Sequence, residues 1–296
     1  MAGRNREVGR SPAPQPAARA ARSAFPPRGV KLGVEAAVAR LHRHPARSTV
    51  APVRLENIVW DARDPQRLGR FWAAALGAEL ITDEPDAVEA RLHLADDVFL
   101  DLCFQRVASP STSPARLHPD LAGGARQQEV VQRLLDLGAE HADIGQGAVP
   151  WVVLADPEGN AFCVMEDREV YRDRGPIAAL PLDSADPDRD AAFWAGITGW
   201  IRWPGMPGAA TLRHPSGVGP LLELCPEPEP RRGKNRLHLD VRRGAGDDRI
   251  VERVLEWGAT PLADPSEHPW LVFADPSGNE FCILDPESAT ILAHDR

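Results

Sequence analysis

The chain has 296 residues, of which 43% are apolar and 26% are charged, and these proportions are typical of a globular protein. Its net charge is −9, but residues 1–50 contain ten Lys and Arg against two Glu, so the remaining residues carry −17. Because nucleic-acid binding needs clustered positive charge on a folded surface, the acidic body excludes nucleic acid as the main partner.

Residues 1–50 are rich in Arg, Pro and Ala, and we expect them to form a disordered basic arm. An Arg-rich, acid-poor start also fits an organellar transit peptide, but the Pro and Ala bias fits an extension in a bacterial protein, the interpretation that we favour. The sequence has no apolar run long enough to span a membrane and no secretory signal. It therefore predicts a cytoplasmic protein with no membrane partner.

The cysteines indicate a reducing compartment rather than a disulfide framework. They are Cys103, Cys163, Cys225 and Cys282, and no two of them form a CxxC pair. This spacing matches neither a disulfide-rich scaffold nor a zinc ribbon.

The sequence repeats itself at a spacing of about 120 residues, and a repeat decides the architecture before any motif is considered. The spacing of the matched segments falls from 122 to 119 along the chain, as expected when short loops are deleted. The matches are Asp64-Pro65 with Asp186-Pro187, Phe71-Trp72 with Phe193-Trp194, Leu102-Cys103 with Leu224-Cys225, Arg116-Leu117-His118 with Arg236-Leu237-His238, Gly159-Asn160 with Gly278-Asn279, and Phe162-Cys163 with Phe281-Cys282. The chain is therefore predicted to be a tandem duplication.

The first half begins with the pattern of a βαβββ unit. Asp64 is expected to cap a helix that has Pro65 at its first position and Gly77 just after its end. The apolar residues of this helix keep the spacing of one buried face: Leu68, Phe71, Trp72, Ala75 and Leu76. The strands of the unit are expected around 53–60, 78–82, 88–94 and 98–104.

A second unit completes each half. It is expected to contain a strand around 116–121, a helix at about 126–137 and strands around 149–155 and 161–166. The apolar face of its helix recurs in the second half: Val130, Val131, Leu134 and Leu135 return as Ile250, Val251, Val254 and Leu255. Gly138 and Gly258 then fit left-handed helix ends. The segments DPEGNAF and DPSGNEF have the residues of tight turns, and a structural role is favoured for them.

The paired βαβββ units, the DP and FW opening, the RLH strand and the DPxGNxFC ending together resemble the glyoxalase-like branch of the vicinal oxygen chelate superfamily, which includes glyoxalases, bleomycin-resistance proteins and dioxygenases. The resemblance implies an α+β fold of two tandem domains, each of paired βαβββ modules forming a half-open barrel. The domains would span 51–172 and 176–291. Fold alone does not fix the activity.

In metal-using relatives, ligands come from the first and last strand of each module. Carried over by position, this implies Asn57, Asp101, His118 and Cys163 in the first repeat and Ala179, Glu223, His238 and Cys282 in the second. The family set is His, Gln or Glu at every position, so both repeats depart from it, and Ala179 cannot bind a metal. The candidate metal ligands are Asp101, His118, Cys163, Glu223, His238 and Cys282.

An imidazole and a carboxylate on neighbouring strands, either Asp101 with His118 or Glu223 with His238, would hold a divalent ion: zinc, nickel, manganese or iron(II). A Cys thiolate beside them would favour zinc. The alternative is that both His residues are ordinary pocket side chains, that the carboxylates pair locally and that the Cys residues are core hydrophobes.

Asp120 and Asp240 each follow a His by two residues, so they share its strand face. They would orient the imidazole, act as general bases, or face solvent at the barrel mouth. The remaining rings are expected to be core packing: Trp60, Trp151, Trp203 and Trp270. No nucleotide-binding or GxSxG motif occurs, so no nucleotide cofactor is expected.

The resemblance implies metal-assisted lyase, isomerase or dioxygenase chemistry on a small oxygenated molecule, with a pocket in each half. The alternative is a non-catalytic protein that binds a small molecule, as the antibiotic-sequestering relatives do. The chain would be a monomer in which the two domains pair, or a homodimer. The unequal positions Asn57 and Ala179 suggest that one repeat has kept the activity.

Overall fold

The computed structural model describes residues 53–263 and 269–286. The predicted basic arm lies outside the described residues.

The first repeat contains the two predicted units in the predicted order. The first is β1 (Arg54–Ala62), α1 (Pro65–Leu76), β2 (Glu79–Asp83), β3 (Ala87–Ala95) and β4 (Val98–Arg106). The second is β5 (Asp120–Gly124), α2 (Gln127–Asp136), β6 (Glu140–His141), β7 (Val152–Ala155) and β8 (Ala161–Glu166), followed by a 3₁₀ turn at Glu169–Tyr171. The main difference from the prediction is that β5 begins later, because residues 116–119 contribute only an isolated bridge at Leu117.

The second repeat follows the same order with shorter strands. Its first unit is β9 (Ile177–Ser184), α3 (Pro187–Thr198), β10 (Ile201–Trp203), β11 (Ala210–Arg213) and β12 (Leu221–Pro226). Its second is β13 (Leu237–Arg242), α4 (Ile250–Glu256), β14 (Thr260–Pro261), β15 (Leu271–Ala274) and β16 (Glu280–Leu284). None of the described helices is long and apolar enough to cross a membrane.

Helix ends follow the sequence signals. The Asp64 side chain accepts a hydrogen bond from the Arg67 backbone N–H at 3.0 Å, and Asp186 caps α3 in the same way. Gly77 and Gly199 end these helices with φ of 68° and 72°, the left-handed conformation that glycine adopts without strain. Both helices therefore begin and end at the predicted residues.

Within the described residues, the strands form two eight-stranded sheets, and each sheet joins units from different repeats. The first sheet has the order β14-β15-β16-β13-β1-β4-β3-β2 and the second has β10-β11-β12-β9-β5-β8-β7-β6. Residues 167–176 connect β8 to β9, which lies in the same sheet, and short connections favour neighbouring elements. The sheets are not closed, so the α+β architecture of half-open modules is confirmed.

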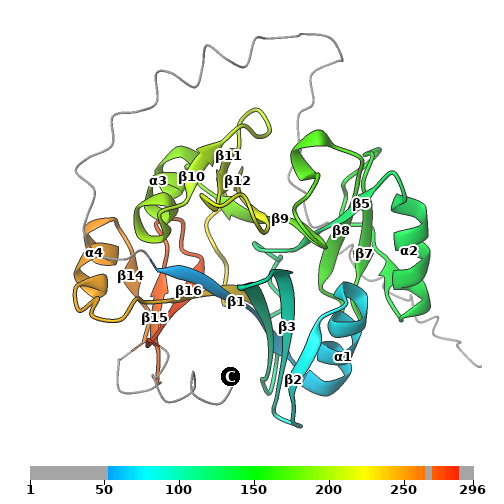
Figure 1. Cartoon of the computed structure of the whole chain (residues 1–296), viewed down its shortest axis with the longest axis horizontal. Coiled ribbons are helices and arrows are strands. Elements are labelled where there is room, and N and C mark those ends of the chain that lie inside the picture. The colour runs from blue at the N-terminus through cyan, green and yellow to red at the C-terminus, as the bar shows by residue number, and fades with distance from the viewer. Residues whose placement is uncertain (1–52, 264–268, 287–296) are drawn as a thin grey trace, which may run out of the picture.

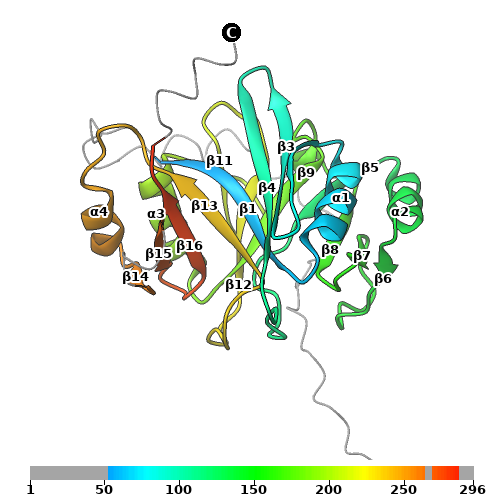
Figure 2. The ribbon, with the colours of Figure 1, turned by 90° about the horizontal axis from the view of Figure 1, so that it is seen from below.

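The two helices of each repeat lie side by side, although α1 packs on β3 and β4 of one sheet and α2 packs on β5 and β8 of the other. Figures 1 and 2 both show α1 beside α2 at one end of the molecule and α3 beside α4 at the other. The Trp72 ring of α1 lies 5.0 Å from that of Phe162 on β8, in the other sheet, and Trp194 lies 5.3 Å from Phe281. Each repeat is thus held together by an aromatic core beneath its helices, while the sheets hold the repeats to each other.

The two DPxGN turns have the structural role that the sequence favoured. Asp156 is buried and accepts hydrogen bonds from the backbone N–H groups of Glu158 and Asn160 and from the Trp72 indole, the last at 3.1 Å. Asp275 makes the same contact with Trp194 at 3.3 Å. Each turn therefore ties the end of its repeat to the first helix of the same repeat.

Arginines of the RLH segments link the repeats through these turns. The Arg116 guanidinium donates to Asn279 Oδ1 at 2.8 Å, and Arg236 lies 3.5 Å from the Glu158 carboxylate. Each arginine contacts the turn of the other repeat. The RLH and DPxGN motifs consequently stabilise the junction between the repeats.

Candidate functional site

We call the side of each sheet that faces away from its helices the inner face. On the inner face of the second sheet lie His118, two residues before β5, Asp120 at the start of β5, and Cys163 on β8. The register places Asp120 opposite Cys163, and His118 Nε2 lies 3.4 Å from Asp120 Oδ1. One ligand atom from each residue lies within 4.8 Å of the other two. We call these three residues the second-sheet cluster.

The first sheet carries the same arrangement, His238 and Asp240 on β13 with Cys282 on β16, which we call the first-sheet cluster. His238 Nε2 lies 3.4 Å from Asp240 Oδ1. Here β1 adds Asn57, whose amide nitrogen donates to Asp240 Oδ2 at 3.1 Å. Ala179 of β9 lies at the corresponding position opposite Asp120 and has no donor atom.

Three buried oxygen atoms on the inner faces make no hydrogen bond of normal geometry among the described residues, although each aspartate oxygen lies 3.4 Å from its His Nε2. These atoms are Asp120 Oδ1, Asp240 Oδ1 and Asn57 Oδ1. Leaving a buried carboxylate oxygen unpaired is costly, and a bound cation removes that cost. Nitrogen, oxygen and sulfur donors at this separation fit a divalent ion, and the sulfur favours zinc.

The predicted ligands Asp101 and Glu223 belong to neither cluster. Asp101 is buried on β4 and accepts two hydrogen bonds from the Arg91 guanidinium, at 2.9 and 2.8 Å. This bidentate pair occupies both of its oxygens. Glu223 on β12 accepts from the Tyr171 hydroxyl at 3.3 Å.

The structure brings His118 together with Cys163 and His238 together with Cys282, as grouped by repeat, but it separates Asp101 and Glu223 from these groups, because each inner face takes strands from both repeats. Asp101 shares its sheet with His238 and Cys282, whereas His118 shares a sheet with Glu223. The expected pairs, Asp101 with His118 and Glu223 with His238, therefore lie in different sheets. A pocket inside each repeat was expected, but each inner face is shared.

The register also separates Asp101 from Glu223. Asp101 is opposite Asn57, whereas Leu221 is opposite Ala179, the position that corresponds to Asn57 in the repeat. Glu223 lies two residues further along, opposite Pro181, whose carbonyl accepts from the His118 backbone N–H. Glu223 is therefore level with His118, and Leu221 corresponds to Asp101.

Burial controls the protonation of the second-sheet groups. Desolvation, together with the charge of Asp120, raises the pKa of Glu223 to about 7. Burial by itself would lower the pKa of His118, but the hydrogen bond and charge of Asp120 outweigh it, so this pKa is raised. Burial, with Asp120, raises the pKa of the Cys163 thiol well above its usual value. Without a cation the thiol therefore stays protonated.

Several inner-face residues of the second sheet were not identified from the sequence. Tyr171 touches Glu223, and Thr211 is opposite Glu223 in the register. Trp151 and Trp203, expected as core packing, line a separate apolar cluster on this face that includes Cys163, Tyr171, Ala179 and Leu221. The sequence signal for this site was the two-residue spacing of His118 and Asp120, which places both side chains on one face of a strand. The sequence of one strand does not show which strands pair with it.

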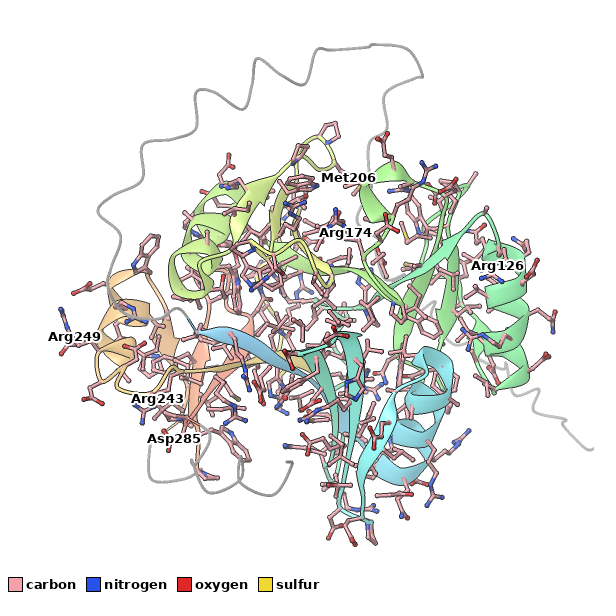
Figure 3. All side chains as sticks on the ribbon, in the orientation of Figure 1. Arg126, Arg174, Met206, Arg243, Arg249 and Asp285 are labelled. Atoms are coloured by element: carbon pink, nitrogen blue, oxygen red, sulfur yellow. The ribbon has the colours of Figure 1, made fainter. Side chains whose placement is uncertain are left out.

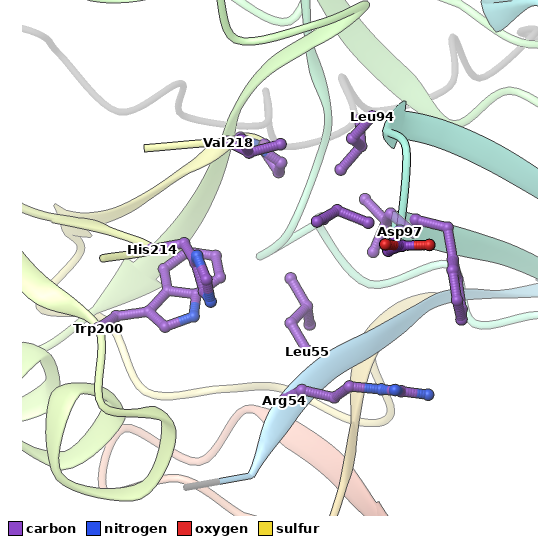
Figure 4. A pocket seen from close by; sticks show the side chains of 12 residues that line it. Arg54, Leu55, Leu94, Asp97, Trp200, His214 and Val218 are labelled. Atoms are coloured by element: carbon purple, nitrogen blue, oxygen red, sulfur yellow. The ribbon is translucent and has the colours of Figure 1, made fainter. Parts of the chain in front are cut away.

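A cavity of about 190 Å³ lies elsewhere, between the two sheets (Figure 4). Arg54 and Leu55 of β1, Leu94 and Asp97 of the β3–β4 hairpin, and Trp200 and His214 of the second repeat point toward it. It contains no residue of either cluster. Burial lowers the pKa of His214, which favours a neutral imidazole there.

Comparisons with known proteins agree with this fold. The sequence profile of the glyoxalase-like domain matches residues 57–165 and 179–284. No curated protein matches the chain. A putative dioxygenase from Bacillus subtilis is 17% identical with a TM-score of 0.57, and the match covers 84% of this chain and 89% of that one. Glyoxalase I from Zea mays is 16% identical with a TM-score of 0.56, covering 79% and 92%. The two profile matches, one in each repeat, show that the chain belongs to the glyoxalase-like domain family.

Proposed function

We propose that the chain uses a divalent metal ion, held by the second-sheet cluster, for chemistry on a small oxygenated molecule. The observation that carries this proposal is that one ligand atom each of His118, Asp120 and Cys163 lies within 4.8 Å of the other two, with Asp120 and Cys163 buried and Asp120 Oδ1 at 3.4 Å from His118 Nε2. The proposed reaction is of the lyase, isomerase or dioxygenase class.

His118, Asp120 and Cys163 would supply the three protein donors. Ala179 contributes none from β9, so the protein leaves coordination positions for the oxygens of a substrate, as open catalytic sites do. A bound divalent ion would act there as a Lewis acid toward substrate oxygens. Zinc fits these donors best, and nickel, manganese and iron(II) are the other candidates.

Glu223 and Tyr171 are the groups placed to handle a proton. Glu223 is level with His118 on the same face, and burial raises its pKa to about 7. A carboxyl group with this pKa exchanges protons readily near neutral pH. The Tyr171 hydroxyl donates to it and fixes the orientation of the carboxylate.

The first-sheet cluster supports a different role. Asn57 adds an oxygen to the donors of His238, Asp240 and Cys282, so the protein itself could provide four donors. A site with four protein ligands is typical of structural metal ions. We therefore assign the reaction to the second sheet and metal-supported stability to the first.

The second candidate function, non-catalytic binding of a small molecule, is favoured by the aromatic side chains of the inner face. Trp151, Tyr171 and Trp203 belong to the apolar cluster that includes Cys163. Aromatic walls with few polar groups are common in ligand pockets whether or not a reaction takes place. The two functions differ in their dependence on metal.

The experiment follows conversion of an α-hydroxy ketone and of a catechol by metal-free protein and by protein supplied with each of the four metals. We expect turnover of at least one probe with metal, loss of at least tenfold in His118→Ala, and no loss in the control His214→Ala. His214 lies in neither cluster. Probe binding that is indifferent to metal, without turnover, would instead identify a binding protein.

A further inference from the structure

A second feature of the same inner face is a pair of arginines that share an aromatic ring. The Arg213 guanidinium, at the end of β11, lies 3.6 Å from the centre of the Trp203 ring, and that of Arg174 lies 5.9 Å from it. Arg174, labelled in Figure 3, belongs to the connection between the repeats, and its side chain reaches Gly217 between β11 and β12. Two cations therefore flank one wall of the site.

The register places Arg213 on the face that carries the second-sheet cluster. Thr211, two residues earlier, is opposite Glu223, and Leu212 is opposite Leu222. Continued by one residue, this register puts Leu221 opposite Arg213. Leu221 is level with Ala179, which is opposite Asp120. Arg213 and Asp120 thus lie at the same level of the sheet.

The duplication supplies an internal comparison. Arg91 of the first repeat corresponds to Arg213, stacks on Phe99 at 3.8 Å, and is opposite Asp101, with which it forms a bidentate ion pair. Leu221 takes the place of Asp101 beside Arg213. The first sheet therefore provides its own carboxylate for this arginine and the second sheet does not.

The charge of Arg213 is left without a counterpart in the described part of the chain. Its Nε is buried and has no hydrogen-bond partner there, and no described carboxylate lies within ion-pair distance of Arg213 or Arg174. Arg174 Nη1 donates to the Gly217 carbonyl at 2.8 Å. Burial and the nearby charge of Arg213 lower the pKa of Arg174. The Thr211 hydroxyl is a further buried polar group without a partner.

We infer that Arg213, supported by Arg174, binds an anionic oxygen group of the ligand. In the second sheet this group would take the position that the Asp101 carboxylate has beside Arg91 in the first sheet. A guanidinium binds carboxylate and phosphate in the same bidentate geometry, and its stacking on Trp203 orients it for that contact. The inference rests on the proposed function, because it places the anion on the same face as the metal donors. The substrate class then becomes a small oxygenated molecule that carries a carboxylate or a phosphate.

The test measures binding of benzoate, inorganic phosphate and uncharged benzamide to the metal-free full chain, followed by tryptophan fluorescence. We expect benzoate or phosphate to bind, and the stronger of the two identifies the anionic group. Benzamide should bind at least tenfold more weakly than benzoate. Arg213→Met and Leu221→Asp should each weaken anion binding at least tenfold, the latter because it recreates the Arg91–Asp101 pair.

The matched controls are Leu221→Asn, which adds a polar group without charge, and Arg202→Met. The second control removes an exposed arginine of β10, the strand beside β11, whose partner is Asp188 of α3. Both should retain anion binding within about twofold. Absence of anion binding in the wild type, or equal binding in Arg213→Met, would overturn the inference. Zinc uptake, measured separately, should persist in Arg213→Met, so a failure of the metal proposal is distinguishable from a failure of this one.

Discussion

Asp120 and Asp240 show what the sequence of a single strand can predict about a site and what it cannot. Their spacing of two residues from His118 and His238 places each carboxylate on the face of its imidazole. The sequence therefore allowed a His–Asp contact, but it did not decide between this contact, a role as general base and a position facing solvent. It could not show that Asp101 is taken by Arg91, because that pairing depends on the register between β3 and β4.

The residue-scale prediction concerns Glu223. A carboxyl whose pKa is raised on folding holds its proton more tightly in the folded state, so the free energy of unfolding falls as pH rises from about 4.5 to about 7. Glu223→Gln cannot ionise and should lack this contribution, on the order of 3 kcal/mol. Denaturant unfolding of the metal-free proteins at pH 4.5 and pH 8 measures the difference. Parallel pH profiles for the two proteins would contradict the assignment.

At the scale of elements, the sequence predicted the features that depend on residues close together in the chain. The Asp-Pro starts and Gly ends of α1 and α3 occur at the predicted residues, because a cap depends on a few neighbouring backbone groups. The pairing of β1 with β13 and of β5 with β9 is not local. Homologous units can exchange partners without changing their own sequence patterns, so the repeat pattern alone did not identify the partners.

Two aspartates of the first repeat allow a matched test of the elements. Asp156→Ala removes the acceptor of the Trp72 indole and of two backbone N–H groups in a buried turn, so we expect a loss of roughly 3 kcal/mol in unfolding free energy. Asp64→Ala removes one exposed helix cap and should cost about 1 kcal/mol. Urea denaturation compares them. Equal losses would show that the turn is not the tie between α1 and β8.

For the whole molecule, the duplication in sequence and the division in space do not coincide. Helices, aromatic cores and the three residues of each cluster follow the repeats, whereas both sheets combine the repeats. The matches to the glyoxalase-like domain at 57–165 and 179–284 follow the first kind of unit, and the expected domains 51–172 and 176–291 stay a prediction. They do not describe the inner faces, because β5 and β13, which carry the clusters, pair with β9 and β1 of the other repeat.

Because the repeats share both sheets, we expect the folded body to unfold as one cooperative unit. Differential scanning calorimetry should give a single transition with calorimetric and van't Hoff enthalpies that agree. Zinc should shift this transition as a whole, since ligand binding stabilises every element that unfolds with its site. Two transitions, only one of which responds to zinc, would indicate repeats that fold independently.

The most direct measurement of the central claim is the zinc content of the chain after loading and removal of free metal. We expect two ions in the wild type, one for each His–Asp–Cys cluster, one in His118→Ala, one in His238→Ala and none in the double variant. The control His214→Ala should keep both. A double variant that still retains zinc, or a wild type that binds none, would contradict the assignment of the clusters as metal sites.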